Sequence, residues 1–242
     1  MNSKIFISNS REELYEHFAM IIIDILAKVN RNINFALSGG STPKAIFDFW
    51  ASNFKDKIEW ERIHFFWGDE RCVPPDHTDS NYLMTFDHLL SKINIPQKNI
   101  FRIEGNNEPE FESKRYSKLL LEHVPPTNKI PSFDLIMLGL GEDGHTASIF
   151  PNSINLIDDP GICAVSKHPS TDQKRITLTG TIINNAAEVV FFITGEKKSK
   201  IVEAILNKRE GFEKLPAAHI NPDHGELMWL LDKGASKLLT VR

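Results

Sequence analysis

The chain has 242 residues, of which 41% are hydrophobic and 25% are charged, a composition typical of a globular protein with a substantial core. The formal net charge of −4 argues against nucleic-acid-binding and membrane-surface proteins, which usually carry a basic patch. The first residues lack the apolar segment of a secretory signal, and the apolar run at residues 19–23 is too short to span a bilayer. The two cysteines, Cys72 and Cys163, are far apart, so we expect no disulfide framework and predict a cytoplasmic protein.

Short apolar runs alternate with amphipathic stretches along the whole chain. The apolar runs predict strands at residues 4–8, 33–37, 63–67, 133–139, 175–179 and 188–194. Between them, the three- and four-residue spacing of apolar side chains predicts helices at residues 10–29, 43–51, 80–91, 109–123, 197–208 and 231–239. The first helix has Ser10 as its expected N-cap, with Glu13 at the spacing of a capping box.

This alternation predicts a Rossmann-like α/β fold, a mainly parallel sheet with helices on both faces. No internal repeat or long linker divides the sequence, and we read the loop-like residues 123–132 as a connection within a single domain over residues 1–242. In an open parallel sheet, ligands bind beyond the carboxyl ends of the strands. The segments that directly follow the predicted strands are therefore the places to look for chemistry.

The first such segment is "SGGSTP", which follows the strand at residues 33–37. Gly40 lets the backbone approach a ligand, Ser41 and Thr42 offer hydroxyl groups, and the next helix points its free N–H groups at the loop. This pattern indicates an anion site, although an ordinary strand–turn–helix connection has the same residue types. The segment also nearly matches the nucleophile elbow of α/β-hydrolases, but too few strands precede it for that fold.

The second segment is "WGDERCVPPDHTDSNY", after the strand at residues 63–67. Its Arg71 could bind a phosphate through a bidentate fork, and Asp69 lies beside it at the strand end, although a salt-bridged surface turn explains the same residues. Cys72 fits a small structural cysteine better than a nucleophile activated by Arg71. No second cluster of ligand residues accompanies "DHTD", so we expect no metal site.

The third segment is "GLGEDGHTASIFP", after the strand at residues 133–139. His145 is the side chain there whose ordinary pKa suits a general base near neutral pH, and Asp143 or Glu142 could orient it. A histidine that caps the following helix or is satisfied in the core is the structural alternative. The glycine-rich setting at a strand end favours catalysis.

Two cations follow later strands, Arg175 in "DQKRITLT" and Lys198 in "TGEKKSK". Lys198 lies at the start of a predicted helix, where the helix dipole disfavours a cation, so an anionic ligand there would explain it. A solvated lysine is the ordinary alternative. His168 and His219 have no supporting context, and we expect both to be structural or surface residues.

Together these motifs resemble the 6-phosphogluconolactonase family, with matching stretches from about residue 5 to residue 240. They are "LSGGSTP", "WGDERCVP" with "DSNY", "DLIMLGLGEDGHTASIFP", "RITLT", "TGEKKSK" and "WLLDKGAS", and the DGHTASIFP part is the most specific. The resemblance implies hydrolysis of 6-phospho-D-glucono-1,5-lactone in the oxidative pentose phosphate pathway. It implies His145 as the general base, Asp143 as its support, and phosphate or substrate contacts from Gly40, Ser41, Thr42, Asp69, Arg71, Arg175 and Lys198.

This reading requires no cofactor, no metal and no macromolecular partner, because a lactone carbonyl is already electrophilic. We expect a monomer or weak homodimer that binds a small sugar-phosphate lactone, with no nucleic acid and no membrane. One alternative is a deaminase–isomerase acting on an amino-sugar 6-phosphate, but the residues after His145 lack the Asn–Glu pair usual in those enzymes. The other is a non-catalytic sugar-phosphate sensor, for whose usual extra domain the chain has no room.

Overall fold

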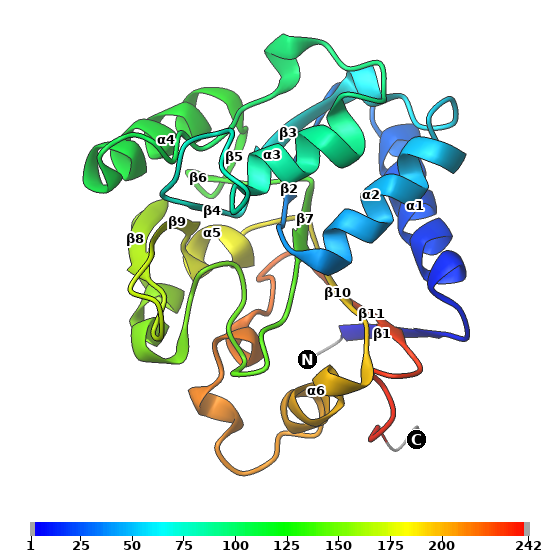
Figure 1. Cartoon of the computed structure of the whole chain (residues 1–242), viewed down its shortest axis with the longest axis vertical. Coiled ribbons are helices and arrows are strands. Elements are labelled where there is room, and N and C mark those ends of the chain that lie inside the picture. Colours follow the sequence, from blue (N-terminus) through cyan, green and yellow to red (C-terminus); the bar gives the residue numbers. More distant parts are fainter. Residues whose placement is uncertain (1–2, 240–242) are drawn as a thin grey trace.

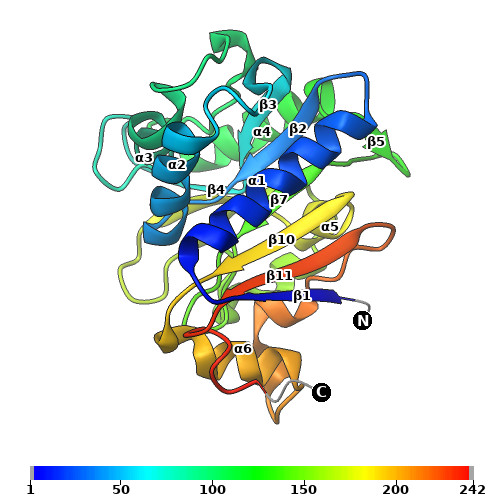
Figure 2. The same cartoon turned by 90° about the vertical axis from the view of Figure 1, so that its right-hand side faces the viewer.

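The computed structural model describes residues 3–239, and within them six parallel strands form one central sheet (Figures 1 and 2). Every residue of the inner strands β7 (Leu135–Leu138) and β2 (Ile33–Leu37) is buried, as expected where both faces of a sheet are covered. Across the sheet, the strands run in the order β1 (Ser3–Ser8), β11 (Glu226–Asp232), β10 (Glu188–Ile193), β7 (Leu135–Leu138), β2 (Ile33–Leu37) and β3 (Ile63–Trp67). The predicted α/β fold with a mainly parallel sheet is confirmed.

The order of the strands reverses between β2 and β7. From β2 the chain moves outward to the edge strand β3, then returns to form β7 on the other side of β2 and continues to β10. β2 and β7 are direct neighbours, with Phe35 opposite Leu135. Because the connections that follow these two strands leave in opposite directions, a crevice opens at their carboxyl ends, which is where such folds bind ligands.

Helices cover both faces of the central sheet. On one face lie α1 (Arg11–Lys28) and α2 (Ser41–Asn53), and on the other lie α5 (Gly180–Asn184) and α6 (Ser199–Leu206) (Figures 1 and 2). The predicted N-cap of the first helix is confirmed, since Ser10 Oγ accepts a hydrogen bond from the Glu13 backbone N–H at 3.1 Å. Glu13 does not complete the capping box, because its carboxylate accepts from Ser8 Oγ and from the Asn9 N–H instead.

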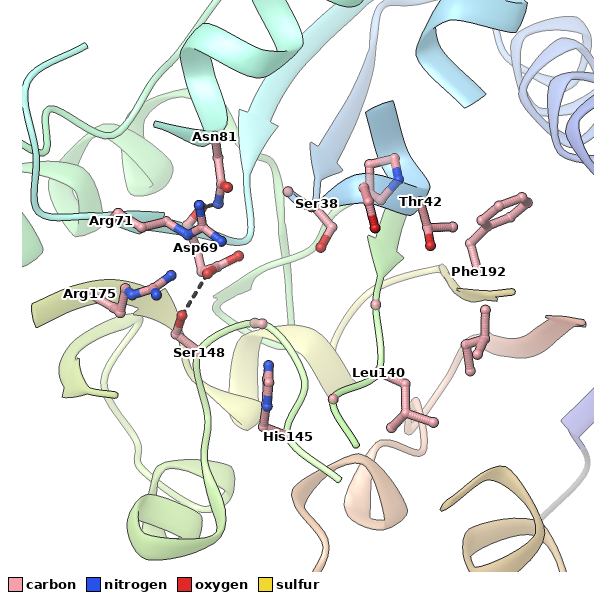
Figure 3. Close-up of a pocket in the computed structure, with 18 of the residues that line it drawn as sticks. Ser38, Thr42, Asp69, Arg71, Asn81, Leu140, His145, Ser148, Arg175 and Phe192 are labelled. Carbon is pink, nitrogen blue, oxygen red and sulfur yellow. Dashed lines mark hydrogen bonds between the residues drawn. The ribbon is translucent and has the colours of Figure 1, made fainter. Parts of the chain in front are cut away.

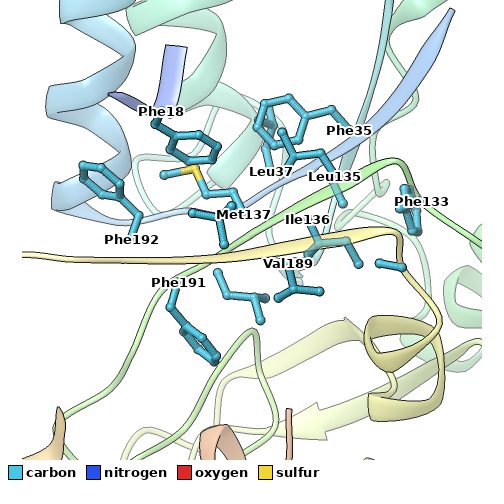
Figure 4. Packing of buried hydrophobic residues seen from close by; sticks show 14 of the residues in the cluster. Phe18, Phe35, Leu37, Phe133, Leu135, Ile136, Met137, Val189, Phe191 and Phe192 are labelled. Atoms are coloured by element: carbon cyan, nitrogen blue, oxygen red, sulfur yellow. The ribbon is translucent and has the colours of Figure 1, made fainter. Parts of the chain in front are cut away.

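The core lies on both sides of the central strands (Figure 4). On the α1 face, the ring of Phe18 lies 6.1 Å from that of Phe35 and 5.8 Å from that of Phe192. On the opposite face, Phe191 stacks on Trp229 of β11 at 4.2 Å. These large side chains are almost fully buried and fix the sheet rigidly, so its carboxyl ends give a stable base for a site.

A second sheet of three antiparallel strands packs beside the carboxyl end of the central one. It has the order β4 (Asp69–Arg71), β9 (Lys174–Leu178) and β8 (Cys163–Lys167). The strand predicted at residues 175–179 is therefore real but belongs to this sheet, because β9 pairs antiparallel with both of its neighbours. The long helix α4 (Pro109–His123) lies against it, and Ser113 Oγ donates to the Cys163 carbonyl at 3.0 Å.

The remaining helices and strands are short. The helix predicted at residues 80–91 forms as α3 (Asn81–Thr85), which continues into a π-helical turn over Phe86–Leu90. The strands β5 (Pro126–Thr127) and β6 (Ile130–Pro131) form a small hairpin in the connection before β7. Within residues 3–239, no helix combines the length and the apolar composition needed to cross a bilayer.

The helix predicted at residues 231–239 is wrong. The first two residues of this range, Leu231 and Asp232, end the apolar strand β11, which lies between β1 and β10 and pairs in parallel with both, Leu230 lying opposite Phe6 and Phe192. Turns, not a helix, follow Asp232. A short continuous apolar run fits a buried parallel strand as well as a helix, and here the two open strand edges decide the outcome.

Candidate active site

A cavity of about 300 Å³ opens at the carboxyl ends of β2 and β7, at the crevice that the strand order creates (Figure 3). Loops after β2, β7 and β10 form its walls together with the small antiparallel sheet. Of the predicted site residues, all but Asp143 line the cavity: Gly40, Ser41, Thr42, Asp69, Arg71, His145, Arg175 and Lys198. The fold therefore brings together side chains that are up to about 160 residues apart in sequence (Gly40 to Lys198).

His145 and Asp143 form a hydrogen-bonded pair in the loop after β7. His145 Nδ1 lies 2.6 Å from Asp143 Oδ1, which also accepts the His145 backbone N–H at 3.2 Å. Burial raises the pKa of the Asp143 carboxyl, but the hydrogen bond and the charge of His145 outweigh burial, so the pKa is lowered. An ionised carboxylate can only accept, so Nδ1 carries the proton and the lone pair is on Nε2.

The loop is folded so tightly that a side chain at position 141 would disturb the hydrogen-bonded pair. A Cβ atom at Gly141 would overlap His145 Nδ1 and Asp143 Oδ1, so these side chains would have to shift. The Gly141 N–H donates to the His145 carbonyl at 2.8 Å and closes the loop. Gly141 thus lets the backbone fold directly against the hydrogen-bonded pair.

A second segment supports this loop from outside. Leu215 packs against Gly144, and the Ala217 N–H donates to the Gly144 carbonyl at 3.0 Å. The supporting segment is Leu215–Pro222, with the sequence "LPAAHINP", and its 3₁₀ turn covers Pro216–His219. His219 is exposed and its Nε2 lies 2.7 Å from the Glu213 carbonyl, as expected for a surface residue. The segment therefore supports the His145 loop through packing.

The loop after β2 presents the start of α2 to the cavity. Gly40 is the N-cap with φ of +107°, a conformation that favours glycine, and no side chain caps the first N–H groups of the helix. Thr42 Oγ1 lies 3.3 Å from Thr194 Oγ1, which joins this loop to the one after β10. Uncapped N–H groups and hydroxyls that face a cavity are suited to binding an anion.

Arg71 and Arg175 lie directly opposite each other on β4 and β9 (Figure 3). Arg71 Nη1 donates to the Asp79 carbonyl at 2.5 Å, but within residues 3–239 the guanidinium of Arg175 has no hydrogen-bond partner and neither Nε is paired. Burial and then the charge of Arg71 lower the pKa of Arg175. Two adjacent guanidinium groups with unused donors match an anion that offers several oxygens, such as a phosphate.

Asp69 and Glu70 have different environments despite being adjacent. Asp69 faces the cavity, and its Oδ2 accepts from Ser148 Oγ at 2.6 Å. The carboxylate of Glu70 is buried and accepts from Ser80 Oγ and from the backbone N–H groups of Arg71, Asn81 and Tyr82. Burial raises the pKa of Glu70, and the backbone donors oppose that rise. Glu70 therefore joins β4 to α3.

Lys198 ends the 3₁₀ turn Glu196–Lys198 and is the N-cap of α6. Burial lowers the pKa of its ammonium group, while the charges of Glu142 and Asp143 oppose the change. The lysine therefore lies at the start of a helix, as predicted, and the carboxylates of the His145 loop are close enough to act on its charge. It supplies a third cation to the cavity wall.

Comparison with known proteins shows which family the sequence matches. A family model described as glucosamine-6-phosphate isomerases/6-phosphogluconolactonase matches residues 9–229. The chain belongs to this family. It is 43% identical over 188 residues to a 6-phosphogluconolactonase of Treponema pallidum, which is 78% of each chain. Identity to the Haemophilus influenzae 6-phosphogluconolactonase is 42% over 216 residues, covering 89% of this chain and 91% of the relative.

Solved structures agree with the family assignment. The 6-phosphogluconolactonase of Trypanosoma brucei superposes with a TM-score of 0.88 at 30% identity, over 99% of both chains. The resemblance of the sequence to the 6-phosphogluconolactonase family is thereby confirmed along almost the whole chain.

The cavity is also lined by residues that the sequence did not point to: Asn81, Ser148, Phe150 and His168. His168, which we expected to be a structural or surface residue, lies in a surface turn and also lines the cavity. No sequence signal points to His168, because its place depends on the pairing of β8 with β9, in which Lys167 lies opposite Lys174. Cys72 is not part of the site, and burial raises the pKa of its thiol to about 11.

Proposed function

We propose that this chain hydrolyses 6-phospho-D-glucono-1,5-lactone to 6-phospho-D-gluconate, a step of the oxidative pentose phosphate pathway. Relatives named 6-phosphogluconolactonase that are more than 40% identical over most of the chain support this activity. The observation that carries it in this chain is the hydrogen-bonded His145–Asp143 pair, whose imidazole lines a cavity together with Arg71, Arg175 and Lys198. A general base can activate water for hydrolysis, and the neighbouring cations can bind the phosphate of an anionic sugar.

In the proposed reaction, His145 Nε2 accepts a proton from a water molecule as the water oxygen attacks C1 of the lactone. General base catalysis of this kind typically contributes about 10²–10⁴ in rate. The resulting imidazolium is stabilised by Asp143, whose carboxylate already accepts the Nδ1 proton. When the C1–O5 bond breaks, His145 returns its proton to the leaving ring oxygen, and the product is the open-chain acid.

The cations and the loop after β2 would hold the substrate in place. We assign the phosphate and the other substrate oxygens to Gly40, Ser41, Thr42, Arg71, Arg175 and Lys198, with Asp69 beside Arg71 at the same wall. Binding energy from the phosphate, which is remote from C1, then orients the carbonyl toward the water and His145.

The activity is tested by making the lactone in place and following 6-phosphogluconate through its dehydrogenase, with spontaneous hydrolysis subtracted. A parallel assay measures ammonia released from glucosamine 6-phosphate. We expect the protein to accelerate lactone hydrolysis and to release no ammonia. A lactone rate equal to the spontaneous one would contradict the proposal, and ammonia release would replace it with the deaminase activity.

We also propose a cytoplasmic location and a monomer or weak homodimer that binds only its small-molecule substrate, without nucleic acid or membrane. Both cysteines are free thiols, as is usual for proteins of a reducing compartment. Light scattering during gel filtration tests the oligomeric state, and a stable higher oligomer would contradict this expectation.

A further inference from the structure

His168 lies at the wall of the same cavity as His145, Arg71 and Arg175, close enough for their charges to act on its ring. It follows β8 directly, in the turn that joins this strand to β9. The ring of Phe150 links the two histidines, since its centroid lies 4.8 Å from that of His145 and 5.2 Å from that of His168. The position of His168 is therefore fixed relative to the residues that we assign to catalysis.

The hydrogen bonds of His168 determine which of its nitrogens carries the proton. Nδ1 lies 3.2 Å from the Ser170 backbone nitrogen and 3.3 Å from that of Thr171. Backbone N–H groups can only donate, so Nδ1 is an acceptor and the neutral ring has its proton on Nε2. Within residues 3–239, the hydrogen bonds of the ring both involve Nδ1, so the Nε2–H is free to donate to a ligand.

His145 and His168 are therefore in opposite tautomers at one cavity. In His145 the carboxylate of Asp143 holds the proton on Nδ1 and leaves a lone pair on Nε2. In His168 the turn holds the lone pair on Nδ1 and leaves a donor on Nε2. His145 Nε2 can therefore accept a proton. His168 Nε2 can only donate a hydrogen bond as long as Nδ1 keeps its hydrogen bonds to the turn.

The surroundings of His168 favour its neutral form. Burial and then the charges of Arg175, His145 and Arg71 lower its pKa, and only Asp143 opposes them. A neutral donor next to two guanidinium groups adds a hydrogen bond to a bound anion without adding a third positive charge to the cluster.

We propose that His168 is a substrate-binding residue whose Nε2–H donates to a phosphate oxygen of the ligand held by Arg71 and Arg175. This inference rests on the proposed function for the identity of the sugar phosphate. It adds a neutral donor, from a turn that the sequence motifs do not include, to the cations of the cavity.

Two variants separate this role from a structural one. In His168→Asn, the side-chain oxygen can take the place of Nδ1 as acceptor in the turn, but the distal donor is lost. In His168→Gln, the distal N–H is restored, but the acceptor close to the backbone is lost. In His168→Asn, we expect the KM for the lactone and the Kd for 6-phosphogluconate to rise about tenfold with little change in kcat. In His168→Gln, we expect both constants to return most of the way to the wild-type values.

The readouts are steady-state kinetics, calorimetric titration with 6-phosphogluconate and thermal unfolding of each variant. The reverse pattern, with affinity retained in His168→Asn and lost in His168→Gln, would show that the ring only holds the turn. Unchanged affinity in both variants, or equal losses that follow a lowered Tm, would also overturn the proposal. If the wild type hydrolyses no lactone, the proposed function fails, and the titration still decides whether Nε2 binds the sugar phosphate.

Discussion

At the scale of single residues, the 2.6 Å contact between Asp143 and His145 determines which imidazole nitrogen can act as a base. In Asp143→Asn, the amide can turn its NH₂ group toward Nδ1 and favour the tautomer with the proton on Nε2, which cannot accept one from water. We expect kcat to fall by about 10²–10⁴-fold with little change in KM, as for other histidines that lose a supporting carboxylate.

Steady-state kinetics of the lactonase reaction check this expectation, with Asp158→Asn as the control because Asp158 is exposed and lies outside the cavity. A kcat within twofold of the wild type in Asp143→Asn would show that the carboxylate does not set the tautomer.

The second prediction at this scale concerns the glycine behind the pair. In Gly141→Ala, the new methyl group would overlap His145 Nδ1 and Asp143 Oδ1, so the pair must separate. We expect most of the lactonase activity to be lost while the far-UV circular dichroism spectrum stays native, since the clash is confined to the loop. Gly68→Ala is the matched control, because its Cβ would make only an ordinary contact of 3.6 Å with the Leu37 carbonyl. Full activity in Gly141→Ala would contradict the proposed role of the pair.

At the scale of elements, Glu70 couples the small sheet to α3. Its carboxylate accepts four hydrogen bonds from Ser80, Asn81, Tyr82 and Arg71. In Glu70→Gln, one oxygen becomes an NH₂ group that faces backbone donors, so at least one buried N–H loses its acceptor. We expect the free energy of unfolding to fall by about 3 kcal/mol.

Urea unfolding measures the effect of Glu70→Gln, and Glu122→Gln is the control because Glu122 is exposed on α4. Equal midpoints for the two variants would mean that the buried carboxylate does not hold α3 to β4.

The elements also show what a sequence can and cannot reveal. β2 and β3 begin and end at the predicted residues, because uninterrupted apolar runs are typical of buried parallel strands. The sequence does not predict β11, whose last two residues fall in the helix predicted at residues 231–239, since a short apolar run fits either structure and only pairing with β1 and β10 distinguishes them. β4 and β8 are short or half-exposed and leave no clear period in the sequence.

The same limit applies to the site. Residues that directly follow a central strand, such as Thr42 and His145, could be proposed from sequence, because carboxyl ends of parallel strands share one edge. His168 and Ser148 could not, since their places depend on the pairing of β8 with β9 and on the hydrogen bond between Ser148 and Asp69. The assignment of roles to the predicted site residues stays a prediction, as does the extent of the single domain over residues 1–242.

At the scale of the whole molecule, the order of the strands explains why the site forms where it does. β2 and β7 are neighbours whose connections diverge, and the loops that carry Thr42 and His145 border the resulting crevice. The antiparallel sheet packs at one side of this crevice and adds Arg71 and Arg175. The base and the cations thus come from separate parts of the chain, and the cavity depends on the complete fold.

The measurement that tests this account most directly is kcat for lactone hydrolysis, with the spontaneous rate subtracted, in wild type and His145→Ala. Thermal unfolding and a titration with 6-phosphogluconate confirm that the variant is folded and binds. We predict that His145→Ala loses at least about 10²-fold in kcat and still binds 6-phosphogluconate. A folded variant with wild-type kcat would keep the lactonase activity but show that His145 is not the base, which would contradict the central claim.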